Sequence, residues 1–131
     1  MKAALSIGWG VIAAIASIPV ASALYSVTAL LWLGGEVSEI AAAAISGIVV
    51  GLFGMIPATL LILGYGLPAF LVLRHFGLVS PWTLIAAAIL PWVPIMGADP
   101  ALLWVGWHSI VAAMTFWTVV RRLPPAGNKD V

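Results

Sequence analysis

The sequence predicts an all-α integral membrane protein, a bundle of four antiparallel transmembrane helices with both termini in the cytoplasm. Its composition predicts the class, because 64% of the 131 residues are hydrophobic and only 7% are charged, whereas soluble domains carry about 25% charged residues. Five Lys and Arg and four Asp and Glu are too few to coat a water-exposed surface. A soluble globule, a disordered chain and a nucleic-acid-binding protein are therefore excluded, and the length indicates one domain.

The spacing of the charges predicts the number of helices. They separate four long neutral runs: Ala3–Gly35, Ile40–Leu73, Phe76–Ala98 and Pro100–Val120. About 20 apolar residues cross the roughly 30 Å hydrocarbon core, and in lipid such runs form helices or a closed barrel. Ile40–Val50 lacks the period-two alternation of a barrel strand. We expect spans near residues 5–33, 40–63 or 40–73, 81–98 and 100–120 of a domain covering 1–123, followed by a short mobile cytoplasmic tail at 124–131.

The distribution of the cations predicts the orientation. With four spans and a cytoplasmic N-terminus, all Lys and Arg residues fall on the cytoplasmic side, as the positive-inside rule requires: Lys2, Arg74, Arg121, Arg122 and Lys129. Glu36, Glu39 and Asp99 fall on the opposite side, and only Asp130 lies inside. The brevity and composition of the chain suggest the inner membrane of a bacterium.

The first run allows two interpretations. Pro19 removes one backbone hydrogen bond from its middle, so we expect a bent helix. Residues 1–23 also resemble a secretory signal peptide, because Lys2 precedes an apolar stretch that ends in small residues at Ala21-Ser22-Ala23. The apolar stretch continues through Leu33, which favours an uncleaved first helix.

The second run contains a packing motif. Its small residues recur at a spacing that lets two helix backbones approach closely: Ala43, Gly47, Gly51, Gly54 and Ala58. The partner can be another helix of this chain or another protein. Further along, the Gly and Pro residues of the segment 64–68 predict a kink, or a break followed by a short interfacial helix.

The last two runs have clear beginnings. Ser80 can cap a helix whose first residue is Pro81, and Pro91 and Pro94 interrupt that helix early. Asp99 followed by proline repeats the cap signal for the fourth helix. We expect kinks in the first three helices.

His108 is the main candidate for chemistry. Among Asp, Glu, Lys, Arg and His it alone lies inside a predicted span, beside Trp104 and Trp107 and on one face with Ala112 and Thr115. An ionisable residue in a span is a functional hypothesis by default. The structural alternative is a neutral imidazole that hydrogen-bonds a neighbouring helix.

Three acids form a second candidate site. Glu36, Glu39 and Asp99 share one side of the membrane with His108 and could bind a ligand or relay protons. No spacing typical of a metal site accompanies them, and solvated loop charges are the favoured explanation. We therefore expect no metal site.

The sequence indicates no enzyme. It lacks cysteine, which excludes disulfides and thiolate chemistry, and we find neither a nucleophile elbow nor a phosphate-binding loop. We expect no cofactor. The favoured hypothesis is a protein that binds other membrane proteins or itself within the lipid bilayer, with the small-residue face and Trp104 and Trp107 as contact surfaces. The alternative is a small oligomeric transporter or channel subunit that uses His108 and the outer acids.

Overall fold

The computed structural model describes residues 2–96 and 102–122, and all regular elements in these ranges are helices. In chain order the elements are α1 (Lys2–Trp32), the 3₁₀-helix η1 (Val37–Glu39), α2 (Ile40–Leu61), the π-helix η2 (Ile62–Gly66), α3 (Leu67–His75), α4 (Pro81–Ile89), the 3₁₀-helix η3 (Leu90–Trp92), α5 (Val93–Met96) and α6 (Leu102–Val120).

Three helices of the described residues are long and apolar enough to cross a membrane, namely Ala3–Trp32, Val37–His75 and Leu103–Val120. The all-helical class is therefore confirmed, and these three helices have the length and apolar character that a membrane protein requires. The third predicted span is represented by Pro81–Trp92, which is apolar but shorter. Pro91 interrupts the α-helix there, because a proline nitrogen has no hydrogen to donate.

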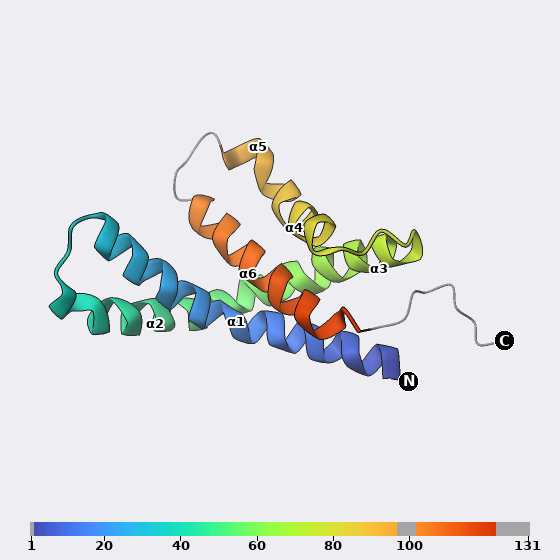
Figure 1. Cartoon of the computed structure of the whole chain (residues 1–131), viewed down its shortest axis with the longest axis horizontal. Coiled ribbons are helices and arrows are strands. Elements are labelled where there is room, and N and C mark those ends of the chain that lie inside the picture. The colour runs from blue at the N-terminus through green and yellow to red at the C-terminus, as the bar shows by residue number, and fades with distance from the viewer. Residues whose placement is uncertain (1, 97–101, 123–131) are drawn as a thin grey trace.

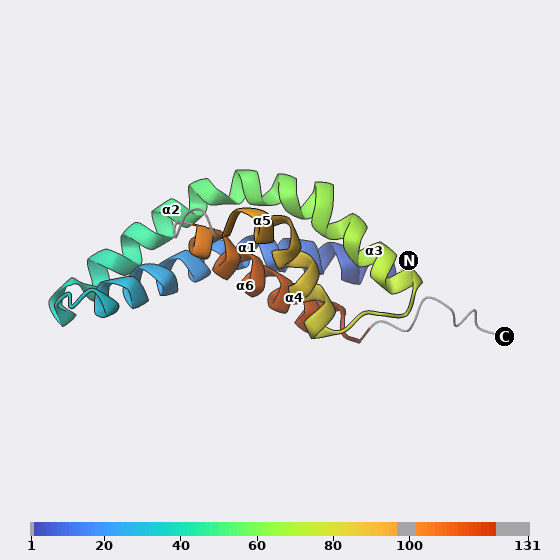
Figure 2. The same ribbon diagram turned by 90° about the horizontal axis from the view of Figure 1, so that it is seen from above.

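The helices are arranged around one long arch. Figure 2 shows α2, η2 and α3 as a continuous curved helix, with α4 and α6 on its inner side. α1 packs most extensively against α2 and next against α6, and α6 also packs against α4. The N-terminal end of α1 and the C-terminal ends of α3 and α6 lie at one end of the molecule, and the turn between α1 and α2 lies at the other (Figure 1).

Two helices end in the same backbone motif. After α1, Gly34 takes φ 78° and its N–H donates to Leu31, while the N–H of Gly35 reaches back to Leu30. After α3, Gly77 takes φ 68° and the following N–H reaches back five residues in the same way. This is the Schellman arrangement, in which a left-handed glycine lets the chain satisfy the last helical carbonyls.

The start of α4 is as the sequence predicts. Ser80 adopts an extended conformation and its hydroxyl accepts a hydrogen bond from the N–H of Thr83 at 3.1 Å. The Thr83 hydroxyl in turn accepts from the N–H of Ser80 at 2.9 Å. Pro81 is the first helical residue, where its missing N–H costs nothing. This end of the short apolar helix is therefore fixed locally.

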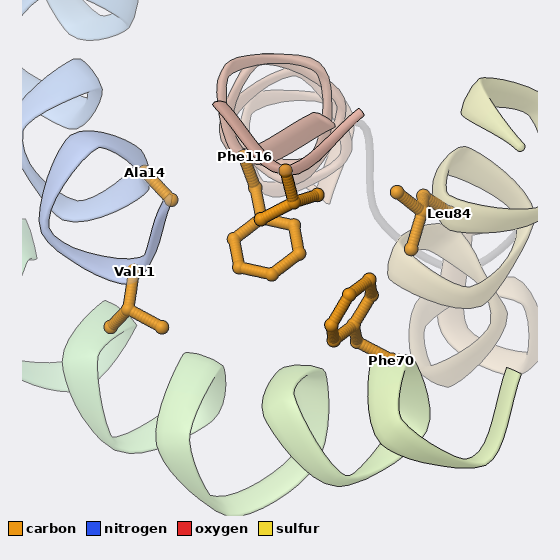
Figure 3. Close-up of a cluster of buried hydrophobic side chains, with 6 residues drawn as sticks. Val11, Ala14, Phe70, Leu84 and Phe116 are labelled. Atoms are coloured by element: carbon orange, nitrogen blue, oxygen red, sulfur yellow. The ribbon is translucent and has the colours of Figure 1, made fainter. Parts of the chain in front are cut away.

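The hydrophobic core lies toward the end of the molecule that holds the N-terminus. It joins α1, α3, α4 and α6 through a cluster of buried side chains: Val11, Ala14, Phe70, Leu84, Phe116 and Val120. In Figure 3, Phe70 and Phe116 point toward each other; their rings meet edge to face with centroids 4.8 Å apart. Such an aromatic contact stabilises the cluster beyond its burial.

Candidate functional site

His108 forms a polar junction with α1. Its side chain is buried, and its Nε2 lies 2.7 Å from the hydroxyl oxygen of Ser22, which is only 1% exposed. Its Nδ1 lies 2.6 Å from the carbonyl oxygen of Trp104, one turn earlier on α6. Because a carbonyl oxygen only accepts, Nδ1 must carry the hydrogen. In the neutral ring Nε2 then accepts the hydrogen of the Ser22 hydroxyl.

Two glycines of α2 bring the arch against this pair. A Cβ added to Gly47 would lie 2.6 Å from the carbonyl oxygen of Ser22, and one added to Gly51 would lie 2.5 Å from the Cα of Pro19. Neither backbone atom can move without separating the helices. We call Ser22, Gly47, Gly51 and His108 the Ser22 junction. The small-residue motif is thus packed against α1 of the same chain at these two glycines.

The other residues of the motif lie less tightly. Gly54 is half-buried, and a Cβ there would be in ordinary contact with Trp104 and Ile18. Ala43 and Ala58 are also half-buried. Among the three glycines of the motif, close approach of the backbones is therefore restricted to Gly47 and Gly51.

The two tryptophans next to His108 contact α1 and the junction. The ring of Trp104 lies 4.1 Å from the imidazole, centroid to centroid. The indole N–H of Trp107 donates to the carbonyl oxygen of Ala21 at 3.0 Å, although the side chain remains 39% exposed. Thr115 donates to the carbonyl of Val111, a local helical bond.

The acids lie apart from His108. Glu36 and Glu39 are exposed in the turn before α2, where the Glu39 carboxylate accepts from the N–H of Glu36 at 3.4 Å. The Glu36 carboxylate accepts from the hydroxyl of Ser38 at 3.1 Å. Negative charge suits the beginning of a helix. Asp99 lies outside the described residues. Within the part of the chain that the structure describes, no three Asp, Glu, His or Cys side chains come together as a metal site.

The chemistry open to the junction is limited by its burial. A serine hydroxyl bonded to an imidazole whose other nitrogen is held by a third group is the arrangement of an activated nucleophile. Here, however, Gly51 covers the Ser22 hydroxyl and His108 is only 8% exposed. The Ser22 side chain itself is only 1% exposed. The arrangement supports a hydrogen bond that joins α1 to α6.

Ser22 belongs to the junction although its sequence context does not single it out. It was visible only as part of the small-residue segment Ala21-Ser22-Ala23, which also fits a signal peptide. No periodicity links it to His108, which lies 86 residues further on. The general rule that a polar side chain in a span seeks a polar partner on another helix was the available signal.

Comparisons with protein-family models, with curated proteins and with solved structures found no match for this chain.

Proposed function

We propose that the protein is not an enzyme and acts by binding other integral membrane proteins within the bilayer, as an accessory subunit, an immunity or exclusion factor or an assembly aid. The proposal rests on the burial of His108, which is 8% exposed and has both ring nitrogens hydrogen-bonded. The side chain best suited to proton or substrate transfer is thus a packing element. The surface left for recognition is the apolar exterior of the helices.

The contact surface that we propose is the outer face of α2. In the most apolar 18-residue stretch of the helix Val37–His75, only 11% of the residues are buried. The corresponding share is 22% in both Ala3–Trp32 and Leu103–Val120. Since Gly47 and Gly51 face α1, a partner must meet the opposite side of α2. There a stripe of large side chains recurs every three or four residues, with exposures from 47% to 76%. This outer stripe consists of Ile45, Val49, Phe53, Ile56 and Leu60.

Photo-cross-linking tests this function. A photoreactive amino acid at Phe53 or Leu60 is expected to give a discrete protein adduct in native membranes, which mass spectrometry identifies. The matched control places the same group at Val20 on α1, which is also exposed but lies outside the outer stripe. Adducts to lipid alone at Phe53 and Leu60 would contradict the proposal. Equal protein labelling at all three positions would count against this surface.

The proposed topology is four crossings, with both termini in the cytoplasm of a bacterium and the chain in its inner membrane. The cations Arg74, Arg121 and Arg122 follow or end helices at the same end of the molecule, and Glu36 and Glu39 lie at the other (Figure 1). This separation favours a cytoplasmic location for the cationic end. α3 and α6 both finish there, so Pro81–Met96 serves as the return crossing.

Thiol labelling tests the topology, because the natural chain has no cysteine. We expect Val37→Cys to react with an impermeant reagent in intact cells, and Phe76→Cys to react only after permeabilisation. Both side chains are exposed, at 77% and 67%. Reaction of the two positions from the same side would overturn the four-crossing arrangement.

The alternative, an oligomeric transporter subunit, receives less support from the geometry. It requires His108 and the outer acids to line one path. Ser22, the partner of His108, lies ten residues before the end of α1, which places the junction about 15 Å from the turn that holds Glu36 and Glu39. Loss of transport in Glu36→Gln at normal expression would revive this alternative.

A further inference from the structure

A cavity of about 130 Å³ lies between α1, η2, α3, α4 and α6. Phe70, Leu84 and Phe116 form its wall on one side and Val11 and Ala14 face them from α1 (Figure 3). It is comparable to an engineered cavity of about 150 Å³ that binds benzene. We call it the inner cavity. Its size suits a short length of hydrocarbon and excludes a whole lipid or a folded segment.

The polar groups of its wall are already paired with one another. Pro91 has no N–H to donate to the carbonyl of Ala87, and the hydroxyl of Tyr65 donates to that oxygen at 3.0 Å. The indole N–H of Trp92 donates to the hydroxyl of Ser109 at 3.2 Å. Among the described residues no buried side-chain nitrogen or oxygen lacks a partner. An ion or a polar solute therefore finds no ligand here, whereas an apolar chain restores the dispersion contacts that an empty space forfeits.

The cavity is reached from the side of the bundle. Leu61 and Tyr65, which form part of its wall, are 45% and 38% exposed. Both lie on helices of the long membrane-spanning arch. The medium outside this opening is the hydrocarbon of the bilayer, so the chain that enters belongs to a lipid.

The charges near the cavity favour an anionic headgroup. Arg74 lies one turn after Phe70 on α3, on the same side of the helix. Arg121 lies five residues after Phe116, about 7.5 Å further along the axis of α6, and Arg121 and Arg122 are exposed. The described acids, Glu36 and Glu39, lie at the opposite end of the molecule (Figure 1). A phosphate at this cationic end is complementary to its surroundings.

We propose that the inner cavity binds one acyl chain of an anionic phospholipid, whose phosphate lies beside the arginines at the ends of α3 and α6. The site is independent of any protein partner on the outer stripe. It takes its hydrocarbon chain through the side of the bundle and holds its headgroup at the cationic surface.

The first test uses the unaltered protein. The purified chain is reconstituted in phosphatidylcholine vesicles that contain phosphatidylglycerol with a photoreactive group in its acyl chain. We expect adducts on cavity residues such as Phe70, Ala88 and Phe116. A photoreactive phosphatidylcholine at the same concentration is expected to label them less. Labelling confined to the outer stripe, or equal labelling by both lipids, would overturn the proposal.

Matched variants sharpen the test. Ala88→Phe fills the cavity and is expected to lose the labelling, whereas Ala86→Phe, on the exposed side of the same helix, keeps it. Replacing Arg121 and Arg122 by Gln is expected to lower the preference for phosphatidylglycerol by about fivefold for each arginine. Glu36→Gln, at the far end, is expected to leave that preference unchanged. Retention of full labelling in folded Ala88→Phe would contradict the site.

Discussion

The Ser22 junction and the inner cavity both join α1, α6 and the long arch, but they are built in opposite ways. At the junction, glycines bring α1 and α2 to backbone contact and a hydrogen bond between buried side chains joins α1 to α6. At the cavity, aromatic and aliphatic side chains meet across a space of about 130 Å³. In lipid, association relies on close packing and interhelical hydrogen bonds, because burial of apolar surface gives little advantage. The junction is thus the more closely packed of the two regions, and we call it the anchor and the region around the inner cavity the cavity end.

The largest expected effect comes from adding bulk at the anchor. In Gly51→Leu, the new side chain meets the backbone of Pro19 at 2.5 Å and the Ser22 side chain at 2.9 Å. Overpacking of this kind against backbone is expected to destabilise the fold by about 3 kcal/mol or more. Unfolding in mild detergent by titration with a denaturing detergent measures this. Gly8→Leu, where a Cβ meets nothing within 4 Å, is the control, and equal loss in both would contradict the distinction.

The same substitution, Ala→Val, made in each region tests directly whether the two regions differ in packing. Ala21 is fully buried where α1 meets Trp107, so Ala21→Val is expected to cost about 1–3 kcal/mol. Ala112 lines the inner cavity, so Ala112→Val is expected to be neutral or to stabilise by up to about 1 kcal/mol. The difference in unfolding free energy between these two variants tests the comparison. A similar cost at Ala112 would show that the cavity end is as tightly packed as the anchor.

Tyr65 supplies one of the hydrogen bonds in the wall of the inner cavity. Tyr65→Phe removes the donor to the Ala87 carbonyl, which Pro91 leaves without a helical partner. We expect a loss of about 1–2 kcal/mol in the same unfolding measurement. In a Pro91→Ala background the helix supplies its own N–H, so Tyr65→Phe is expected to cost less there. An equal cost in both backgrounds would exclude this role for Tyr65.

The smallest effect concerns the bond within the anchor. His108→Leu and Ser22→Ala each remove one partner of the 2.7 Å contact. Interhelical hydrogen bonds in membrane proteins contribute about 0.6 to 1.7 kcal/mol, so a double-mutant cycle is expected to give a coupling near 1 kcal/mol. Thr28→Ala, whose hydroxyl bonds only its own helix, should show no coupling to His108→Leu. A cycle with zero coupling for Ser22 would leave the glycines alone as the anchor.

The sequence predicts the helices well because the constraint on them is local. Long neutral runs must be helical in lipid, and the Ser80 cap and the glycine motif act over a few residues. The prediction falls short where the partner lies elsewhere in the chain. Gly47 and Gly51 predict a close helix contact, but they do not identify α1 as the partner. His108 predicts a polar partner, but it does not identify Ser22.

No pattern in the sequence predicts the inner cavity. It exists because small residues on two helices face each other across the core, Ala87 and Ala88 on α4 and Ala112 and Ala113 on α6. Periodicity describes one helix at a time, and the volume between helices depends on their separation. The π-helix was likewise predicted only in part. The Gly and Pro residues of the segment 64–68 predict a kink or a break in the helix, and they do not distinguish a π-helix from these.

The π-helix determines which way the far half of the arch faces. The N–H of Leu67 bonds the carbonyl of Ile62, five residues back, so η2 accommodates one residue more than an α-helical turn. In an uninterrupted α-helix, Phe70 would be rotated about 140° around the axis from Gly47; the extra residue takes back about 100° of that rotation. Gly47 and Phe70 thus face the same interior of the bundle. A one-residue deletion within Ile62–Gly66 that restores a regular α-helical turn is expected to keep both halves facing the interior, whereas a one-residue insertion there would turn the second half by about 100°.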